Sequence, residues 1–119
     1  MTSADEVPVL TLHDGTEIPQ LGFGTWQIER DETQEKVEEA LSAGYRHIDT
    51  AAAYGNEASV GKAIRESGIR REDVFITSKL RNACHGYVAT LEAFEQTIAR
   101  LGVEYLDLYL IHWPNPLQY

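Results

Sequence analysis

The sequence is poor in three features, and each scarcity excludes a class of protein. Cys84 is the only cysteine among 119 residues, which excludes a disulfide framework and a zinc site built on cysteines. No apolar run approaches the roughly 20 residues that a membrane-spanning helix needs. Lysine and arginine number 10 against 19 acidic residues, and the net charge of −9 argues against nucleic acid or a membrane as partner.

The start of the chain bears on targeting as well. Its first ten residues, MTSADEVPVL, lack the basic start and the long apolar segment of a signal peptide. Together with the scarcity of cysteine, this predicts a cytoplasmic protein. Apolar residues make up 43% of the chain and charged residues 24%, the balance of a folded globular domain.

What the sequence does have is a regular alternation of strand-like and helix-like segments. Asp14-Gly15 between two short β-like runs predicts a hairpin over residues 7–18. Strands are then predicted at 20–26, 45–50, 73–80 and 105–113, and helices at 30–44, 56–68 and 87–102. The residues predicted to face inward from the helices are Val37, Ala40, Leu41, Val60, Ala63, Ile64, Leu91, Phe94, Ile98 and Leu101.

This alternation is typical of a parallel sheet covered by helices. Two architectures fit it: a complete small doubly wound sheet, and part of a (β/α)8 barrel. About four strand–helix units of roughly 30 residues make half of a barrel, which needs eight units in roughly 250 residues. A free half-barrel would expose two strand edges and an apolar inner face. Composition and periodicity favour neither architecture.

In either architecture, reactive side chains gather where the strands end. The predicted strand ends carry Gly24, Thr25, Trp26, Asp49, Lys79, His112 and Trp113, and Tyr54 follows Asp49 in a loop. Alternation along a strand places Thr77 and Lys79 on one face, and Leu110 and His112 on one face. Each predicted row therefore ends in a polar group.

These groups together suit one kind of chemistry. Asp49 and Lys79 on neighbouring strand ends can pair, which offsets the cost of burying either alone. A phenol has an ordinary pKa of about 10, and a nearby ammonium lowers the pKa of a phenol. Such a tyrosine can give a proton to a developing alkoxide, while a histidine orients the carbonyl. Each residue alone has an ordinary structural explanation, but the combination favours carbonyl reduction.

A metal-dependent hydrolase is a weaker alternative. His47 and Asp49 lie two residues apart on one strand face, and His112 could be a further ligand. Lys79 at the centre of the site and the lack of a fourth ligand argue against it. We therefore predict no metal site.

Four motifs, LGFGTWQ, GYRHIDTAAAYGNE, ITSKL and DLYLIHWPNP, resemble in this order those of the aldo-keto reductases. The resemblance is strongest to bacterial members of the diketogluconate reductase type, and it covers essentially the whole chain. It implies a (β/α)8 TIM barrel in which residues 1–119 form the N-terminal half of a single domain. The hairpin at 7–18 would then cap the bottom of the barrel.

The resemblance also implies roles for individual residues. Tyr54 would be the general acid, Lys79 the ammonium that activates it, Asp49 the partner of Lys79, and His112 the residue that orients the carbonyl. The implied cofactor-binding residues are Gly24, Thr25 and Asp49. The implied substrate-binding residues are Trp26, Ala53, Tyr54, His112 and Trp113. Arg81 stands where the family often has tryptophan, which favours a polar or anionic substrate.

The implied activity is NADPH-dependent reduction of small aldehydes and ketones, with NADH as the alternative cofactor. The family takes its nicotinamide-stacking and phosphate-binding residues from later strands, and the glycines at 22–24 are not a dinucleotide fingerprint. The full-length form is expected to be a monomer. Taken alone, the 119 residues would instead be an inactive half-barrel that self-associates or serves as a folding unit.

Overall fold

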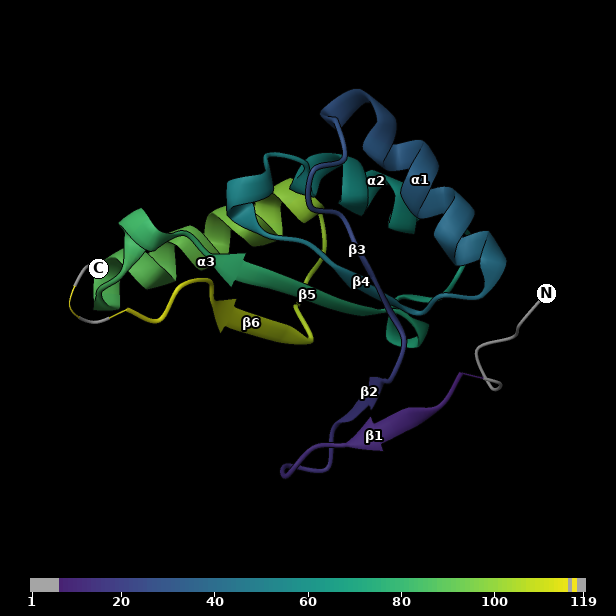
Figure 1. The fold of residues 1–119 in the computed structure, drawn as a ribbon, viewed down its shortest axis with the longest axis horizontal. Coiled ribbons are helices and arrows are strands. Elements are labelled where there is room, and N and C mark those ends of the chain that lie inside the picture. Colours follow the sequence, from purple (N-terminus) through teal and green to yellow (C-terminus); the bar gives the residue numbers. More distant parts are fainter. Residues whose placement is uncertain (1–6, 116, 118–119) are drawn as a thin grey trace.

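The computed structural model describes residues 7–115 and 117, which form a four-stranded parallel sheet with helices packed against one face (Figure 1). Residues 1–6, on which the prediction of a missing signal peptide partly depends, lie outside the described residues. No helix in the described part of the chain is long and apolar enough to cross a membrane.

The N-terminal hairpin lies apart from the main sheet (Figure 1). Its strands β1 (Val9–Thr11) and β2 (Glu17–Pro19) pair antiparallel, so β2 extends one residue beyond the expected range of 7–18. Gly15 in the turn has a φ of 89°, which a glycine adopts without strain. The hairpin borders Arg46 and Phe75 at the amino ends of two central strands. Closure of a barrel by this hairpin stays a prediction.

The sheet follows the chain in simple order. Its strands are β3 (Gly22–Gly24), β4 (His47–Asp49), β5 (Phe75–Leu80) and β6 (Leu108–Ile111). They are arranged β3-β4-β5-β6 and all neighbours are parallel. A doubly wound sheet reverses its strand order, whereas a barrel adds each strand beside the last. The uninterrupted order therefore matches half of a (β/α)8 barrel. All four strands are shorter than predicted.

Helices connect the strands on one side of the sheet (Figure 1). They are α1 (Arg30–Ala43), α2 (Glu57–Glu66) and α3 (Tyr87–Leu101). Short 3-10 turns precede or follow them: η2 (Ala52–Tyr54), η3 (Arg71–Asp73) and η4 (Asn82–Cys84). The predicted order of strands and helices is thus observed throughout.

The hydrophobic core lies between the sheet and these helices. Its buried members are Val37, Leu41, Ile48, Val60, Ala63, Ile64, Val74, Ile76 and Leu101. Ile48 and Ile76 point toward the helices, so alternation turns Asp49, Thr77 and Lys79 to the opposite face of the sheet. In a barrel this opposite face is the inner one. The predicted rows of side chains that end in Lys79 and in other polar groups therefore lie on the inner face.

One predicted helix face is confirmed in part. Leu101 is buried in the core, and Phe94 and Ile98 are half-buried, whereas Leu91 is 52% exposed. The prediction missed Ala93 and Thr97, which are buried on the same side of α3 as Leu101. This side lies close to α2: a Cβ added to Gly61 would lie 2.0 Å from the carbonyl oxygen of Leu101.

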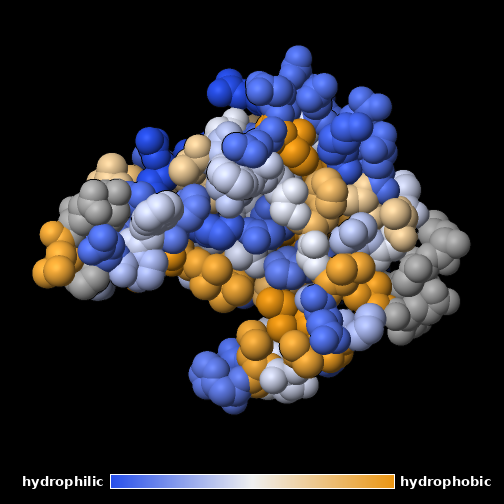
Figure 2. Space-filling model, in the orientation of Figure 1, coloured by the Kyte–Doolittle hydropathy of each residue, from blue (hydrophilic) through white to orange (hydrophobic). Residues whose placement is uncertain are grey.

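The β6 side of the sheet is open. Leu110, Ile111 and Trp113 are all exposed, and Figure 2 shows hydrophobic residues along this side and on the hairpin. Within the described residues, the outer edges of β3 and β6 pair with no other strand. These are the exposed edges that a half-barrel is expected to have.

Candidate active site

Lys79 is the centre of the group of polar residues at the carboxyl ends of the strands. Its ammonium contacts the Asp49 carboxylate and donates a hydrogen bond to the Thr50 carbonyl oxygen at 3.0 Å. The Tyr54 hydroxyl lies 3.4 Å from the same nitrogen. The Lys79 side chain is 13% exposed and the Asp49 side chain 40%. The cation is thus enclosed, while its carboxylate partner remains accessible.

His112, the residue that follows β6, completes this group. Its ring packs edge-on against Tyr54, with centroids 5.7 Å apart and an interplanar angle of 80°. Its backbone N–H donates to the Leu80 carbonyl oxygen at 3.3 Å, which ties it to β5. Burial, reinforced by the Lys79 ammonium and partly offset by Asp49, lowers the pKa of His112. The imidazole is therefore neutral near pH 7, and a neutral ring has one N–H to donate.

The structure thus brings together the four residues that the sequence predicted as catalytic. Asp49 ends β4, Tyr54 ends η2, Lys79 lies near the end of β5, and His112 follows β6. Parallel strands in register explain this, since Asp49 lies opposite Thr77, and Lys79 opposite Leu110. Their assigned roles in catalysis stay predictions.

A buried polar network holds the turn that carries Tyr54. The Asn56 amide donates to the Thr25 carbonyl oxygen at 2.9 Å, and its oxygen accepts from the Thr50 hydroxyl at 3.0 Å. The Thr25 hydroxyl lies 3.0 Å from that of Thr50, and all three residues are buried. Sequence reasoning missed Asn56, although its position just before α2 was a signal. The hydroxyl of Thr25 faces this network, and its contact with a cofactor stays a prediction.

A second buried network lies on the other face of β5, and sequence reasoning missed it too. Glu57, the first residue of α2, accepts hydrogen bonds from Ser78 at 2.6 Å and from Arg100 at 2.7 Å. Ser78 directly precedes Lys79. The network therefore fixes the strand beside Lys79 to both α2 and α3.

The predicted cofactor contacts include one open position on the inner face. No atom lies within 4 Å of where a Cβ would stand on Gly24, and Gly24 pairs with Asp49 across the strands. This open surface beside an accessible carboxylate fits a flat ring and a hydroxyl-bearing ribose. Gly24 and Asp49 could thus hold the nicotinamide end of a cofactor.

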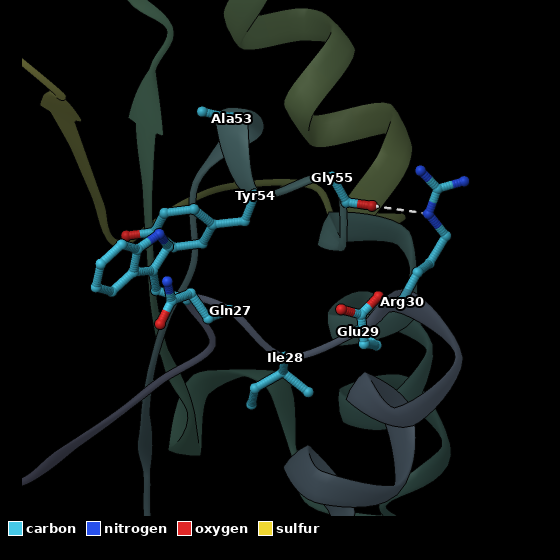
Figure 3. Close-up of a pocket in the computed structure, with 8 residues that line it drawn as sticks. Gln27, Ile28, Glu29, Arg30, Ala53, Tyr54 and Gly55 are labelled. Atoms are coloured by element: carbon cyan, nitrogen blue, oxygen red, sulfur yellow. Dashed lines mark hydrogen bonds between the residues drawn. The ribbon is translucent and has the colours of Figure 1, made fainter.

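A cavity of about 300 Å³ lies beside Tyr54 (Figure 3). It is lined by Trp26, Gln27, Ile28, Glu29, Arg30, Ala53, Tyr54 and Gly55. Three of the predicted substrate-binding residues therefore share this cavity, whereas His112 and Trp113 do not line it. Trp113 lies exposed beyond β6.

Two further sequence predictions concern neighbouring residues. His47 lies 2.8 Å from the Thr77 hydroxyl and packs edge-on against Phe75 on the inner face. In the described part of the chain, no group of three or more potential ligands is placed to hold a metal ion. Arg81, predicted to alter a substrate wall, lines a different cavity, with Cys84 and Arg100.

Comparison with known proteins agrees with this geometry. A model of the aldo/keto reductase family matches residues 20–119. An aldo-keto reductase of Mycolicibacterium smegmatis is 59% identical over 109 residues, covering 92% of this chain and 40% of that protein.

Solved structures lead to the same family. A crystal structure of an aldo/keto reductase from Brucella melitensis superposes with a TM-score of 0.90 at 60% identity, covering 92% of this chain and 42% of that one. A Bombyx mori aldo-keto reductase in complex with NADP gives a TM-score of 0.87 at 39% identity, covering 96% and 39%. The chain thus spans about 40% of the length of these relatives. The neighbours confirm the barrel architecture predicted above.

Proposed function

This chain belongs to the aldo/keto reductase family, and from that premise we propose that its protein reduces small aldehydes and ketones to alcohols with NADPH. One observation carries the proposal: the Lys79 ammonium contacts Asp49 and lies 3.4 Å from the Tyr54 hydroxyl. An enclosed cation beside a phenol stabilises the phenolate that remains after the phenol gives up its proton. The site is therefore suited to deliver a proton.

The chemistry divides between the cofactor and the protein. A bound nicotinamide cofactor would supply the hydride that adds to the carbonyl carbon. Tyr54 donates its proton to the carbonyl oxygen, which becomes the hydroxyl of the product. Lys79 stabilises the resulting phenolate, and Asp49 compensates the charge of Lys79. The phenolate then regains a proton from solvent.

His112 orients the substrate in this proposal. Because the pKa of His112 is lowered, its ring is neutral near pH 7. A neutral imidazole can donate one hydrogen bond to the carbonyl oxygen without adding a second cation beside Lys79. Its edge-on contact with Tyr54 keeps donor and proton source on the same side of the substrate.

The cofactor part of the proposal rests on fewer residues. The open surface at Gly24 and the accessible carboxylate of Asp49 support binding of the nicotinamide ribose. The NADP-bound Bombyx mori relative supports NADPH as the cofactor, with NADH as the alternative. A cytoplasmic location is proposed for the same protein, on the strength of its family.

The test is the variant Tyr54→Phe in the protein at its natural length. Removing the hydroxyl while keeping the ring should lower carbonyl-dependent NADPH oxidation by a factor on the order of 10² to 10⁴. Tyr87→Phe is the matched control, because Tyr87 is exposed on α3. Unchanged turnover in Tyr54→Phe would refute the proposed acid. Retained tryptophan fluorescence quenching by NADPH would show that the cofactor site is intact.

For the 119 residues as an isolated polypeptide we propose a different behaviour. The exposed Leu110, Ile111 and Trp113 and the free edges of β3 and β6 favour association. We expect no reductase activity and a sedimentation mass above that of a monomer. A stable monomer that binds NADPH would contradict this expectation. Monomeric behaviour is proposed instead for the protein at its natural length.

A further inference from the structure

Asn56 stands at the start of α2, where an asparagine usually caps the helix. A capping side chain accepts a hydrogen bond from a backbone N–H in the first turn, which stabilises a helix by about 1 kcal/mol. The Asn56 side chain makes no such bond, although the residue is only 1% exposed. The buried carboxamide therefore serves another part of the protein than the helix that it begins.

The Asn56 carboxamide is bonded to two other segments of the chain. Its nitrogen donates to the carbonyl oxygens of Thr25 and Ile28, at 2.9 and 3.4 Å. Its oxygen accepts from the Thr50 hydroxyl at 3.0 Å. Both the donor and the acceptor of the carboxamide are thus occupied.

The bond to Thr50 closes the loop that carries Tyr54. Thr50 and Asn56 stand at the two ends of residues 50–56, and their side chains join these ends. Within the loop, the Tyr54 N–H donates to the carbonyl oxygen three residues before it at 3.1 Å. Gly55 has a φ of 73°, which turns the chain back without strain. The Tyr54 side chain therefore projects from a backbone that is held on both sides.

The same end of the loop also holds Lys79. The Thr50 carbonyl oxygen accepts a hydrogen bond from the Lys79 ammonium at 3.0 Å. The Thr50 N–H donates to the Thr77 carbonyl oxygen at 2.9 Å, which ties Thr50 to the strand that carries Lys79. Thr50 thus contacts the ammonium directly and is connected to Tyr54 through Asn56. The 3.4 Å between the Tyr54 hydroxyl and Lys79 depends on both connections.

The remaining bonds of Asn56 hold the turn after β3. The Ile28 N–H donates to the Thr25 carbonyl oxygen at 3.2 Å, and the Asn56 nitrogen donates to both ends of this turn. Gln27 within the turn has a φ of 65°, which a residue other than glycine rarely adopts. Such a conformation persists where surrounding contacts hold it. Gln27 and Tyr54 line the same cavity (Figure 3), so Asn56 holds the backbone on two sides of it.

We propose that Asn56 is a positioning residue that places the Tyr54 hydroxyl at the Lys79 ammonium. Its side chain is buried and does not line the cavity, so it acts through the loop and not on the substrate. The proposal rests on the reductase function above, whose proton donor it places. Without the carboxamide the loop is free to shift, and a displacement of about 1 Å can lower a rate on the order of 10²-fold.

Three variants in the protein at its natural length test this role. Asn56→Ala removes every bond of the carboxamide. Thr50→Val removes only the hydroxyl that closes the loop, and keeps the test available if Asn56→Ala does not fold. Thr97→Val is the matched control, because Thr97 is a buried threonine on α3 that accepts a hydrogen bond from Arg100 at 3.3 Å.

We expect kcat for the reduction of propanal to fall on the order of 10²-fold in Asn56→Ala. Loss of one hydrogen bond should lower it about five- to tenfold in Thr50→Val. Thr97→Val should lower Tm by a similar amount to Thr50→Val and leave kcat unchanged.

A double-variant cycle separates positioning from a merely structural role. In protein that already carries Tyr54→Phe, no hydroxyl remains to be placed, so Thr50→Val or Asn56→Ala should lower the single-turnover rate little further. Equal fold losses with and without the Tyr54 hydroxyl would overturn the proposal.

Amide hydrogen exchange separates the proposal from the reductase function, because it needs neither cofactor nor substrate. In Thr50→Val, residues 50–56 should exchange about five- to tenfold faster than in wild type, while α3 exchanges at the wild-type rate. This result supports the positioning role even if wild type does not reduce propanal. Wild-type exchange of residues 50–56 in both Thr50→Val and Asn56→Ala refutes it, even if Tyr54→Phe proves inactive.

Discussion

Two ion pairs flank β5, one on each face, and they differ in which partner is enclosed. On the inner face, Lys79 is 13% exposed and its partner Asp49 is 40% exposed. On the outer face, the Glu57 carboxylate is 1% exposed and its partner Arg100 is 42% exposed. In the first pair, the Asp49 carboxylate is accessible at the carboxyl ends of the strands. In the second pair, the Glu57 carboxylate is covered by α2 and α3.

The difference shows that the two faces of β5 have different roles. Ser78 and Lys79 are adjacent, and alternation sends Ser78 to Glu57 and Lys79 to Asp49. The outer pair therefore anchors the strand on which the inner pair depends. We infer that the inner pair matters for chemistry and the outer pair for stability.

The largest expected effect is on the inner pair. In the protein at its natural length, Lys79→Met should reduce carbonyl reduction on the order of 10²-fold or more, because the phenolate of Tyr54 loses its stabilising cation. Stability should change little, since Asp49 is accessible to water. Steady-state kinetics and urea unfolding measure the two effects. Lys62→Met on the exposed side of α2 is the control, and comparable losses in both variants would contradict the assignment.

The outer pair should respond in the opposite way. Arg100→Leu leaves a buried, uncompensated carboxylate on Glu57 and should lower the free energy of unfolding by about 3 kcal/mol. Glu57→Gln leaves the half-exposed Arg100 able to reach water, and should cost about 1 kcal/mol. Urea denaturation gives both values. An equal loss of unfolding free energy in the two variants would show that burial of the Glu57 carboxylate does not determine the contribution of this pair to stability.

Two glycines sharpen the comparison between the faces. Gly61→Ala places a Cβ against the Leu101 backbone on the outer face, and should cost about 2 kcal/mol of unfolding free energy. Gly24→Ala adds a Cβ to open space on the inner face, and should change stability by less than about 0.5 kcal/mol. Thermal unfolding tests both. A tolerated Gly61→Ala would mean that α2 and α3 can move apart.

The smallest effect concerns the histidines of the inner face. Burial is the main cause that lowers the pKa of His47 and of His112 below their ordinary value of 6.5. The unfolded chain therefore binds protons more readily near that pH, so stability falls as the pH drops below 6.5. Unfolding midpoints measured across this window should show the decline. His112→Gln should make it shallower, and an unchanged slope would assign it to other groups.

Much of the fold could be predicted from local patterns. The alternating segments predicted the order of strands and helices, and the inward residues of α1 and α2 were confirmed as buried. The polar residues of the candidate site could be predicted from two rules. The carboxyl ends of parallel strands lie at the same edge of a sheet, and successive side chains of a strand point to opposite faces. The choice of a barrel required the resemblance, because half a barrel and a small doubly wound sheet have the same local pattern.

The remaining features depend on distances between elements. On α3 the prediction was wrong for Leu91, which is exposed, and the close approach of Gly61 to Leu101 is a contact that no spacing within α3 reveals. The network around Asn56 joins residues more than 20 positions apart. Gln27 has a φ of 65° in a turn whose two ends, at Thr25 and Ile28, accept hydrogen bonds from the buried Asn56 amide. No sequence pattern within one strand or helix predicts this helix contact, this hydrogen-bond network or this turn conformation.

The sequence by itself therefore determined which residues could reach the carboxyl ends of the strands, because alternation and strand order are properties of the local chain. Only the tertiary structure decided that Lys79 is enclosed while Asp49 stays open, and that Glu57 is covered while Arg100 is not. Enclosure depends on which helices pack over each face. That packing is set by contacts between residues far apart in the chain.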